Sequence, residues 1–170
     1  MNDRGSELTG DLVLSELKHL GIDAQVMPCD PELADTAEFC TAYGVAPEDS
    51  ANAILVTGKS EPRIYVLCLV LATCRLDVNG VVRKRLGVRK ASFAGFEETQ
   101  NLTGMTIGGV TPFGLPTPLP VWIDAAVMER ETVVIGGGSR NRKLRLAPDR
   151  LLSVPNAEVV SDLARPAPID

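Results

Sequence analysis

The sequence predicts a single domain that mixes helices and strands, of the α/β or α+β class. Segments typical of helices and of strands alternate along the chain with short connections, without an internal repeat or a linker. The chain has 170 residues, 45% of them hydrophobic and only 4% aromatic, so we expect one core built mainly of Val, Leu, Ile and Ala. We therefore assign residues 1–164 to one domain and expect the proline-rich tail, residues 165–170, to be frayed.

Helices are predicted from capping residues and from the spacing of apolar side chains. Ser6 is a suitable N-cap for a helix with leucines on one face, and Gly21 and Gly44 are suitable residues after helix ends. The segment around Asn79-Gly80 keeps helical spacing of its apolar positions, although this dipeptide is unfavourable in a helix. The expected helical segments cover residues 6–20, 32–43, 76–86, 95–102, 124–128 and 148–152.

Strands are predicted where short apolar runs are bounded by turn residues. The run from Ile64 to Cys74 is too short to span a membrane and predicts a buried strand. Together with the segment ANAILVT before it, this run predicts a β-hairpin through Gly58-Lys59-Ser60. The expected strands cover residues 22–27, 51–57, 63–73, 88–93, 120–123, 132–135, 143–146 and 157–160.

Few residues of this chain suit catalysis by a side chain. Its single histidine, His19, lies in a helix pattern with neighbours typical of a surface position, so we expect neither a histidine zinc site nor a Ser-His-Asp triad. The four cysteines form no C-x-x-C pair and are expected to be reduced. The first twenty residues lack the apolar region of a signal peptide, so we expect a cytoplasmic protein.

Charge is distributed unevenly. Residues 1–62 carry twelve Asp and Glu against three Lys and Arg, whereas residues 63–170 carry ten against fourteen. Two local groups could steer an anionic ligand to one face, although each could equally be solvated surface charge. The first basic cluster comprises Arg83, Lys84, Arg85, Arg89 and Lys90, and the second comprises Arg140, Arg142, Lys143 and Arg145.

A loop rich in glycine and proline stands out in the segment MTIGGVTPFGLPTPLPVWID, residues 105–124. Glycine lets the backbone approach a ligand closely, and proline restricts the chain to a few shapes, so Gly108 and Gly109 could present fixed backbone N–H groups. The alternative is an ordinary wide turn between a helix and a strand.

The order of these features resembles one known family. The segments LTG, GGVTPFGLP, PVWID, ETVVIGGGSR and KLRLAPDRLL follow one another as in the YbaK/prolyl-tRNA synthetase-associated editing domain. The likeness covers roughly residues 10 to 160, and its most specific part is the G-x-x-x-P motif from Gly108 to Pro112. The resemblance implies a barrel-like mixed β-sheet surrounded by helices.

It also implies a trans-acting deacylase that hydrolyses the ester of mischarged tRNA, of the Cys-tRNAPro or Ala-tRNAPro type. In this family the G-x-x-x-P loop contributes backbone donors to the ester, and a ribose hydroxyl is thought to help position the water. The implied partner is the 3′ end of aminoacyl-tRNA, with neither membrane, metal nor cofactor, while a homodimer is left open. The catalytic candidates are Gly108, Gly109 and Asn52, and the substrate-binding candidates are Thr111, Pro112, Ser139, Arg140 and Lys143.

One departure from the family bears on activity. The family usually has a lysine where this chain has Asn52, which can donate hydrogen bonds but has no charge. Lys143 is a candidate for the missing cation, and Arg140 in a Gly-rich turn is a candidate contact for a phosphate. The replacement leaves two alternatives to the deacylase, a binding module that has lost activity and a small-molecule hydrolase or binder. Trp122 and Asp124 are expected to be structural.

Overall fold

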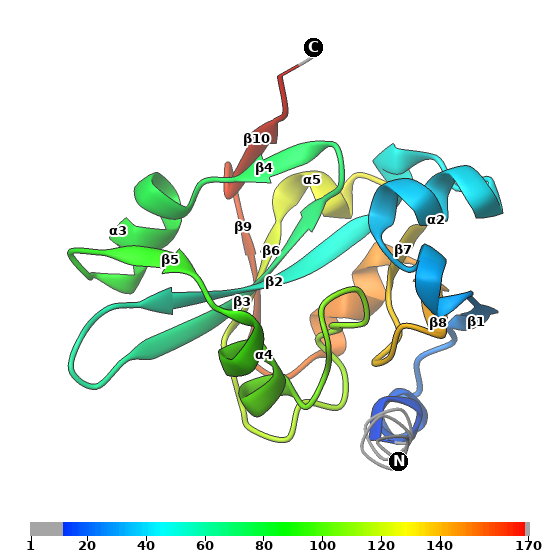
Figure 1. The fold of residues 1–170 in the computed structure, drawn as a ribbon, viewed down its shortest axis with the longest axis horizontal. Helices are drawn as coiled ribbons and strands as arrows, with labels where there is room; N and C mark the ends of the chain where they lie inside the picture. Colours follow the sequence, from blue (N-terminus) through cyan, green and yellow to red (C-terminus); the bar gives the residue numbers. More distant parts are fainter. Residues whose placement is uncertain (1–11, 169–170) are drawn as a thin grey trace.

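A mixed five-stranded sheet runs through the centre of the computed structural model, which describes residues 12–168 (Figure 1). Its strands lie in the order β5-β2-β3-β6-β9, with the β2–β3 and β2–β5 pairs antiparallel and the β3–β6 and β6–β9 pairs parallel. The strands are β2 (Ala51–Gly58), β3 (Ile64–Leu71), β5 (Ala91–Phe93), β6 (Val121–Asp124) and β9 (Ala157–Val160).

Two smaller antiparallel sheets accompany the central one. The first, in the order β1-β8-β7, consists of β1 (Gln25–Pro28), β8 (Arg142–Leu146) and β7 (Val133–Gly136). A parallel bridge between Ser50 and Val134 connects this sheet to the start of β2. The second pairs β4 (Cys74–Leu76) with β10 (Ala164–Pro166), near the C-terminal end of the chain in Figure 1.

Short helices cover these sheets. They are the helix over residues 12–19, α2 (Thr36–Tyr43), α3 (Arg83–Leu86), α4 (Phe96–Thr103) and α5 (Ala125–Met128). Turns of 3-10 helix at Pro31–Leu33, Pro47–Asp49 and Pro148–Ser153, and a π-helical turn at Val78–Val82, complete the set. Figure 1 shows α2 close to the β1-β8-β7 sheet and α4 at the lower side of the central sheet.

The main core lies between the central sheet and the β1-β8-β7 sheet. Apolar side chains from both sheets join one buried cluster, among them Leu67 and Ile123 from the central sheet and Ile135 and Leu144 from the smaller one. The two larger sheets therefore enclose a common core in the barrel-like manner that the family resemblance implied, while the strand order within each sheet is open.

Most of the predicted elements are present, and the β2–β3 hairpin is confirmed, with Ala51 opposite Leu71 and Gly58 opposite Ile64. Gly44, Gly87 and Gly104 each follow a helix in the left-handed conformation, as expected of C-terminal glycines. The Ser6 cap and residues 169–170 of the predicted tail lie outside the described residues. Among residues 12–168, no helix is long and apolar enough to cross a membrane.

Three predicted segments differ from the structure. The helix expected over residues 32–43 is divided, because Asp35 has an extended backbone between the 3-10 turn and α2. In place of the helix expected over residues 76–86, the chain forms the end of β4, a π-helical turn that contains Asn79-Gly80, and then α3. Arg165 and Pro166, expected to be frayed, pair with β4 in strand β10.

Candidate functional site

A cavity of about 400 Å³ opens beside the Gly-Pro loop. Its walls come from the first half of β2, the N-terminal end of α2, the segment after β5, the loop itself and strand β8. Small side chains form much of the wall, and the residues that bring polar groups to it include Asp35, Thr36, Asn52, Thr99 and Lys143. The cavity therefore combines room for a small ligand with a few convergent polar groups, as ligand sites do.

Lys143 is the buried cation of this cavity. It lies in the middle strand of the β1-β8-β7 sheet and is only 7% exposed. Its Nζ donates hydrogen bonds to Ala34 O at 2.7 Å and to Gly108 O at 2.8 Å, and it lies 5.4 Å from the centre of the Phe39 ring. Because an ammonium group has three N–H donors, one is left for a ligand.

Burial is the main reason why the pKa of Lys143 is lowered from its ordinary value of 10.5. The neighbouring Cys29 thiol opposes this shift, the Arg140 guanidinium adds to it, and the Asp35 carboxylate opposes it again. Two carbonyl acceptors and one aromatic face stabilise the ammonium where water is largely excluded. The electrostatic field of this cation is consequently strong on the side that faces the cavity.

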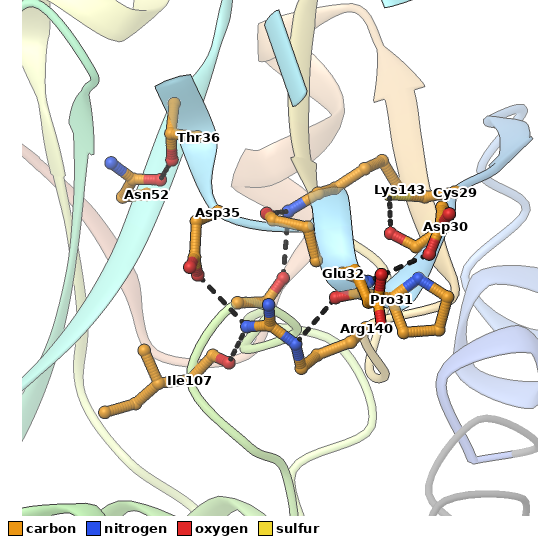
Figure 2. Close-up of polar contacts among 12 residues, drawn as sticks. Cys29, Asp30, Pro31, Glu32, Asp35, Thr36, Asn52, Ile107, Arg140 and Lys143 are labelled. Carbon is orange, nitrogen blue, oxygen red and sulfur yellow. Dashed lines mark hydrogen bonds and ion pairs between the residues drawn. The ribbon is translucent and has the colours of Figure 1, made fainter. Parts of the chain in front are cut away.

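Arg140 lies next to Lys143 and joins the same two segments of the chain (Figure 2). Its Nε donates to Pro31 O at 3.1 Å, and its Nη1 donates to Ile107 O at 2.9 Å and to the Asp35 carboxylate at 3.0 Å. Lys143 connects residues 34 and 108 in the same way. The two cations thus fasten the segment before α2 to the Gly-Pro loop and fix one wall of the cavity.

Glycines allow the Gly-Pro loop to pack directly on the Gly-rich turn after β7. A Cβ on Gly109 would lie 2.6 Å from the backbone carbon of Ser139, and one on Gly136 would lie 2.2 Å from Val110 O. Gly108 has φ +97°, and a Cβ there would lie 2.2 Å from Arg140 Nη1. Gly138 N–H also donates to Gly109 O at 2.7 Å. These glycines are required for close approach of backbone to backbone.

The N–H groups of the G-x-x-x-P motif are not equally available. Gly109 N–H donates to Thr106 O at 2.9 Å, and Thr111 N–H lies 3.4 Å from Met105 Sδ. Gly108 and Val110 line the cavity, and their N–H groups donate to no residue within 12–168. Within residues 12–168, the N–H groups of Gly108 and Val110 are therefore without an acceptor, whereas the N–H of Gly109 is already used within the loop.

Asn52 lies across the cavity on β2, where its side-chain oxygen accepts a 2.7 Å hydrogen bond from the Thr36 hydroxyl. This contact, visible in Figure 2, fixes the amide so that its NH₂ group remains as a donor. Asn52 and Lys143 come from different sheets and line one cavity. The structure thus brings together the position of the family lysine and the candidate replacement cation.

Other predicted site residues lie outside the cavity wall. Thr111 and Pro112 are buried within the loop, and the Thr111 hydroxyl has no hydrogen-bond partner among the described residues. Ser139 is buried, and its hydroxyl contacts the Asn141 side chain. Arg140 reaches the loop from behind Gly108. These residues support the wall of the cavity and do not form its surface.

Trp122 and Asp124, expected to be structural, are both buried. Trp122 packs in a core cluster below the Arg85 guanidinium, 4.9 Å from the ring centre. Asp124 makes no side-chain capping hydrogen bond to α5. Burial raises the pKa of its carboxyl group, and hydrogen bonds from backbone groups of Ala164 and Leu163 oppose that shift. Asp124 therefore ties the β10 segment to β6.

Sequence reasoning missed several cavity residues, including Asp35, Thr36, Phe93, Thr99 and Ile107. Asp35 and Thr36 have the appearance of ordinary residues at a helix start, and Phe93 and Ile107 that of strand and loop residues. A sequence feature that could have indicated one of these residues is the pair Arg89-Lys90 followed by an aromatic residue, Phe93. His19 is exposed, as expected, and the cysteines are free thiols. Burial raises the pKa of Cys68 to about 12, so this thiol is a poor nucleophile.

The first basic cluster is partly used within the fold. Arg83 donates to Asn79 O and Val88 O, and Arg85 pairs with Glu158 at 2.8 Å. Lys84, Arg89 and Lys90 are exposed and make no side-chain hydrogen bond or ion pair with a described residue. These three cations are therefore available to a partner.

Comparison with known proteins shows which family has this sequence pattern and fold. The family model "Aminoacyl-tRNA editing domain" matches residues 30–154. "Uncharacterized protein YwhH" of Bacillus subtilis is 29% identical over 78% of this chain and 82% of its own. "Putative Cys-tRNA(Pro)/Cys-tRNA(Cys) deacylase EbsC" of Enterococcus faecalis is 23% identical over 62% of each chain.

Solved structures agree with this assignment. The "Crystal structure of a putative trans-editing enzyme for prolyl tRNA synthetase" has a TM-score of 0.79 and 26% identity, over 94% of this chain and 98% of that one. The "hypothetical protein APE2540" has the same fold, with a TM-score of 0.80 and 24% identity over 90% of this chain and 99% of that one. Because the family model matches most of the chain, including the residues of the cavity and of the Gly-Pro loop, the chain belongs to the aminoacyl-tRNA editing domain family.

Proposed function

We propose that this protein is a trans-acting aminoacyl-tRNA deacylase that hydrolyses mischarged tRNA of the Cys-tRNAPro or Ala-tRNAPro type. The observation that carries the proposal is the buried Lys143 ammonium beside Gly108 on the wall of the 400 Å³ cavity. It supplies a cation where the replacement by Asn52 removes one. The name of the Enterococcus faecalis relative, a Cys-tRNA deacylase, supports the substrate class.

In the proposed reaction the ester carbonyl oxygen lies near the N–H groups of Gly108 and Val110 and the remaining N–H of Lys143. Water adds to the carbonyl carbon, and the negative charge that develops on the oxygen is stabilised by these donors. The carbon–oxygen bond to the ribose then breaks, which releases the amino acid and a tRNA with a free terminal hydroxyl. Asn52 orients the ribose or the carbonyl through its amide NH₂ group.

The proposed substrate has a small side chain. Alanines at positions 34, 51, 53 and 94 line the cavity, so their methyl groups form part of its wall. A larger side chain on the ligand would compete for the same volume as the ribose. Discrimination of one methylene group in an apolar site is worth about 1–3 kcal/mol, so a preference for alanyl or cysteinyl over larger groups is expected.

The test is release of amino acid from a panel of tRNAs charged with cysteine, alanine, serine or proline. We expect turnover above the spontaneous rate with Cys-tRNAPro or Ala-tRNAPro. Free amino acid should appear at the rate at which charged tRNA disappears. Turnover indistinguishable from buffer across the whole panel removes the proposal.

Asn52 favours a second candidate, a binding module of the same family without activity. The two are separated by Asn52→Lys, with Asn52→Gln as the neutral control of similar length. If Lys143 supplies the cation, a second cation in the cavity adds no activity and depresses the pKa of Lys143 further. Hydrolysis that is absent in the natural chain and appears with Asn52→Lys supports the binding module. Undetectable tRNA affinity at low salt favours instead a small-molecule ligand.

A further inference from the structure

We infer that the unpaired 3′-terminal nucleotides of an RNA dock on the surface formed by Lys84, Arg89, Lys90, Phe93 and Phe96, which we call the mouth surface. This inference rests on the proposed function and deepens it, because it assigns residues to the recognition of the nucleic acid rather than of the ester. Two separate observations support it: exposed aromatic side chains at and next to the cavity, and unpaired cations in α3 and in the residues just before β5.

Large apolar side chains are exposed around the opening of the cavity. Phe93 is 58% exposed, Phe96 is 55% exposed and Ile107 is 53% exposed. Phe93 and Ile107 line the cavity itself, and Phe96 begins α4 three residues after Phe93. Exposed apolar side chains gathered at one place, rather than scattered singly, are typical of interaction sites. Flat rings at the mouth of a cavity suit the faces of nucleic acid bases, whatever the sequence.

Arg89 and Lys90 come just before β5 in the chain, and Lys84 lies in the preceding helix α3. β5 is the outermost strand of the central sheet and pairs only with β2, with Ala91 opposite Gly58 and Phe93 opposite Val56. Lys90 directly precedes β5, and its carbonyl accepts from Lys59 N–H at the end of the β2–β3 hairpin. The chain rises about 3.3 Å per residue in a strand, so Lys90 lies roughly 10 Å from Phe93.

Figure 1 shows the same arrangement, with β5 leading from the side of α3 toward α4. A nucleotide strand that places its terminal ribose in the cavity could therefore stack on Phe93 and Phe96 and pass its phosphates to Arg89, Lys90 and Lys84. Along the chain the cations come before β5, Phe93 ends β5 and Phe96 begins α4, an order that fits a nucleic acid backbone entering from the α3 side.

The acidic groups near this surface are few. Glu98 is held by the Tyr65 hydroxyl at 2.8 Å and lies 3.6 Å from Arg63, so its charge is balanced. Glu97 is exposed at the start of α4. Three unpaired cations against one unpaired carboxylate leave the described part of the mouth surface positive, which favours phosphate. By contrast, Arg140 and Lys143 are occupied by Asp35 and by backbone carbonyls.

The experiment measures binding of an uncharged RNA hairpin with four unpaired 3′ nucleotides, because binding is then separate from hydrolysis. The same hairpin with a blunt end is the reference. The full chain is compared with Phe93→Ala, Phe93→Trp and the double variant Arg89→Gln/Lys90→Gln. Leu152→Ala, which removes a 51% exposed side chain on another element, and Lys18→Gln, which removes an exposed cation, are the controls.

We expect Phe93→Ala to weaken binding of the overhang hairpin about 10-fold, and Phe93→Trp to retain it, since stacking on a base contributes at this scale. Arg89→Gln/Lys90→Gln should reduce the slope of log K against log salt by about 1.4, which corresponds to two lost contacts with a single strand. The control variants should bind like the unaltered chain. All variants should melt within a few degrees of it.

Binding of the overhang hairpin that is unchanged in Phe93→Ala, or a salt slope that is unchanged in the double variant, overturns the inference. So does equal binding of the blunt hairpin. If the protein hydrolyses charged tRNA but the variants bind the hairpin as the unaltered chain does, the proposed deacylase is retained and the mouth surface is rejected. If binding depends on these residues but no charged tRNA is hydrolysed, the proposed deacylase function is rejected and the mouth surface is retained.

Discussion

The two basic clusters have similar composition but opposite roles in the structure. In the first, Lys84, Arg89 and Lys90 project into solvent without a partner among the described residues. In the second, Arg140 and Lys143 turn inward and fasten two segments of the chain around a cavity. The difference arises because Lys143 lies in a middle strand under α2, where the backbone carbonyls of Ala34 and Gly108 are within reach.

A run of Lys and Arg in a sequence therefore does not by itself predict an exposed basic surface. Side chains of a middle strand point alternately to its two faces. A cation on the face that the rest of the fold covers must find hydrogen-bond acceptors inside the protein. Where cations surround a short helix at the edge of the molecule, they remain solvated. The following predictions separate these two situations, from the largest expected effect to the smallest.

Lys143→Met should reduce deacylation about 100-fold or more, because it removes the cation beside the ester and leaves two carbonyls without their donor. Lys84→Met, the same change in the first cluster, should leave the rate at saturating tRNA within about 2-fold and should raise only the tRNA concentration that saturation requires. Single-turnover rates with Ala-tRNAPro measure both. Equal rates in the two variants would mean that Lys143 has no part in the chemistry.

Arg140→Met should lower kcat about 10-fold and reduce the melting temperature, because the segment before α2 loses its attachment to the loop. A matched change in the first cluster, Arg89→Met, should instead raise KM and reduce its dependence on salt. If Arg140→Met alters only KM and its salt dependence, Arg140 contacts a phosphate and is not a positioning residue.

Gly108→Ala and Gly87→Ala form a matched pair of glycine changes, since both residues have positive φ, +97° and +70°. Each should cost about 1–2 kcal/mol of stability for the left-handed conformation. Only Gly108→Ala should also reduce deacylation, because its Cβ would lie 2.2 Å from Arg140 Nη1, whereas a Cβ at Gly87 would meet no atom within 4 Å. Thermal melts and deacylation rates of both variants test this, and equal activity would contradict it.

The smallest expected effect is on pH dependence. The lowered pKa of Lys143 means that the folded protein binds fewer protons than the unfolded chain between the folded-state value and about 10.5. The contribution of Lys143 to stability is therefore least favourable when the group is charged and improves as pH rises through that interval. Denaturant unfolding at several pH values should show this slope, and Lys143→Met should lack it.

Deacylation should follow the opposite course, since the charged form of Lys143 stabilises the developing oxyanion. After subtraction of spontaneous ester hydrolysis, kcat/KM should fall as pH rises through the folded-state pKa, below 10.5. Lys84→Met should show the same fall as the unaltered chain. An activity that increases steadily to pH 10.5 would contradict a cationic role.

Much of the secondary structure could be predicted because local signals agree with the fold. The β2–β3 hairpin follows from two apolar runs around a turn, and the glycines after α2, α3 and α4 mark helix ends that are present. The errors occurred where distant contacts override local preference. Arg165 and Pro166 form a strand only because β4 is available beside them.

The sequence by itself determined the family resemblance, the class of fold and the loop that borders the cavity, because these depend on the order of short motifs and on glycine and proline. Only the tertiary structure decided which residues of that loop have an N–H to offer, and which of the cations are buried. The N–H of Gly109 donates to Thr106 O, Lys143 is buried next to the Phe39 ring of α2, and Arg140 donates to Asp35 and to Ile107 O of the loop. Hydrogen-bond partners far apart in sequence, such as Ala34 and Lys143, are fixed by how the sheets pack, and no local pattern records them.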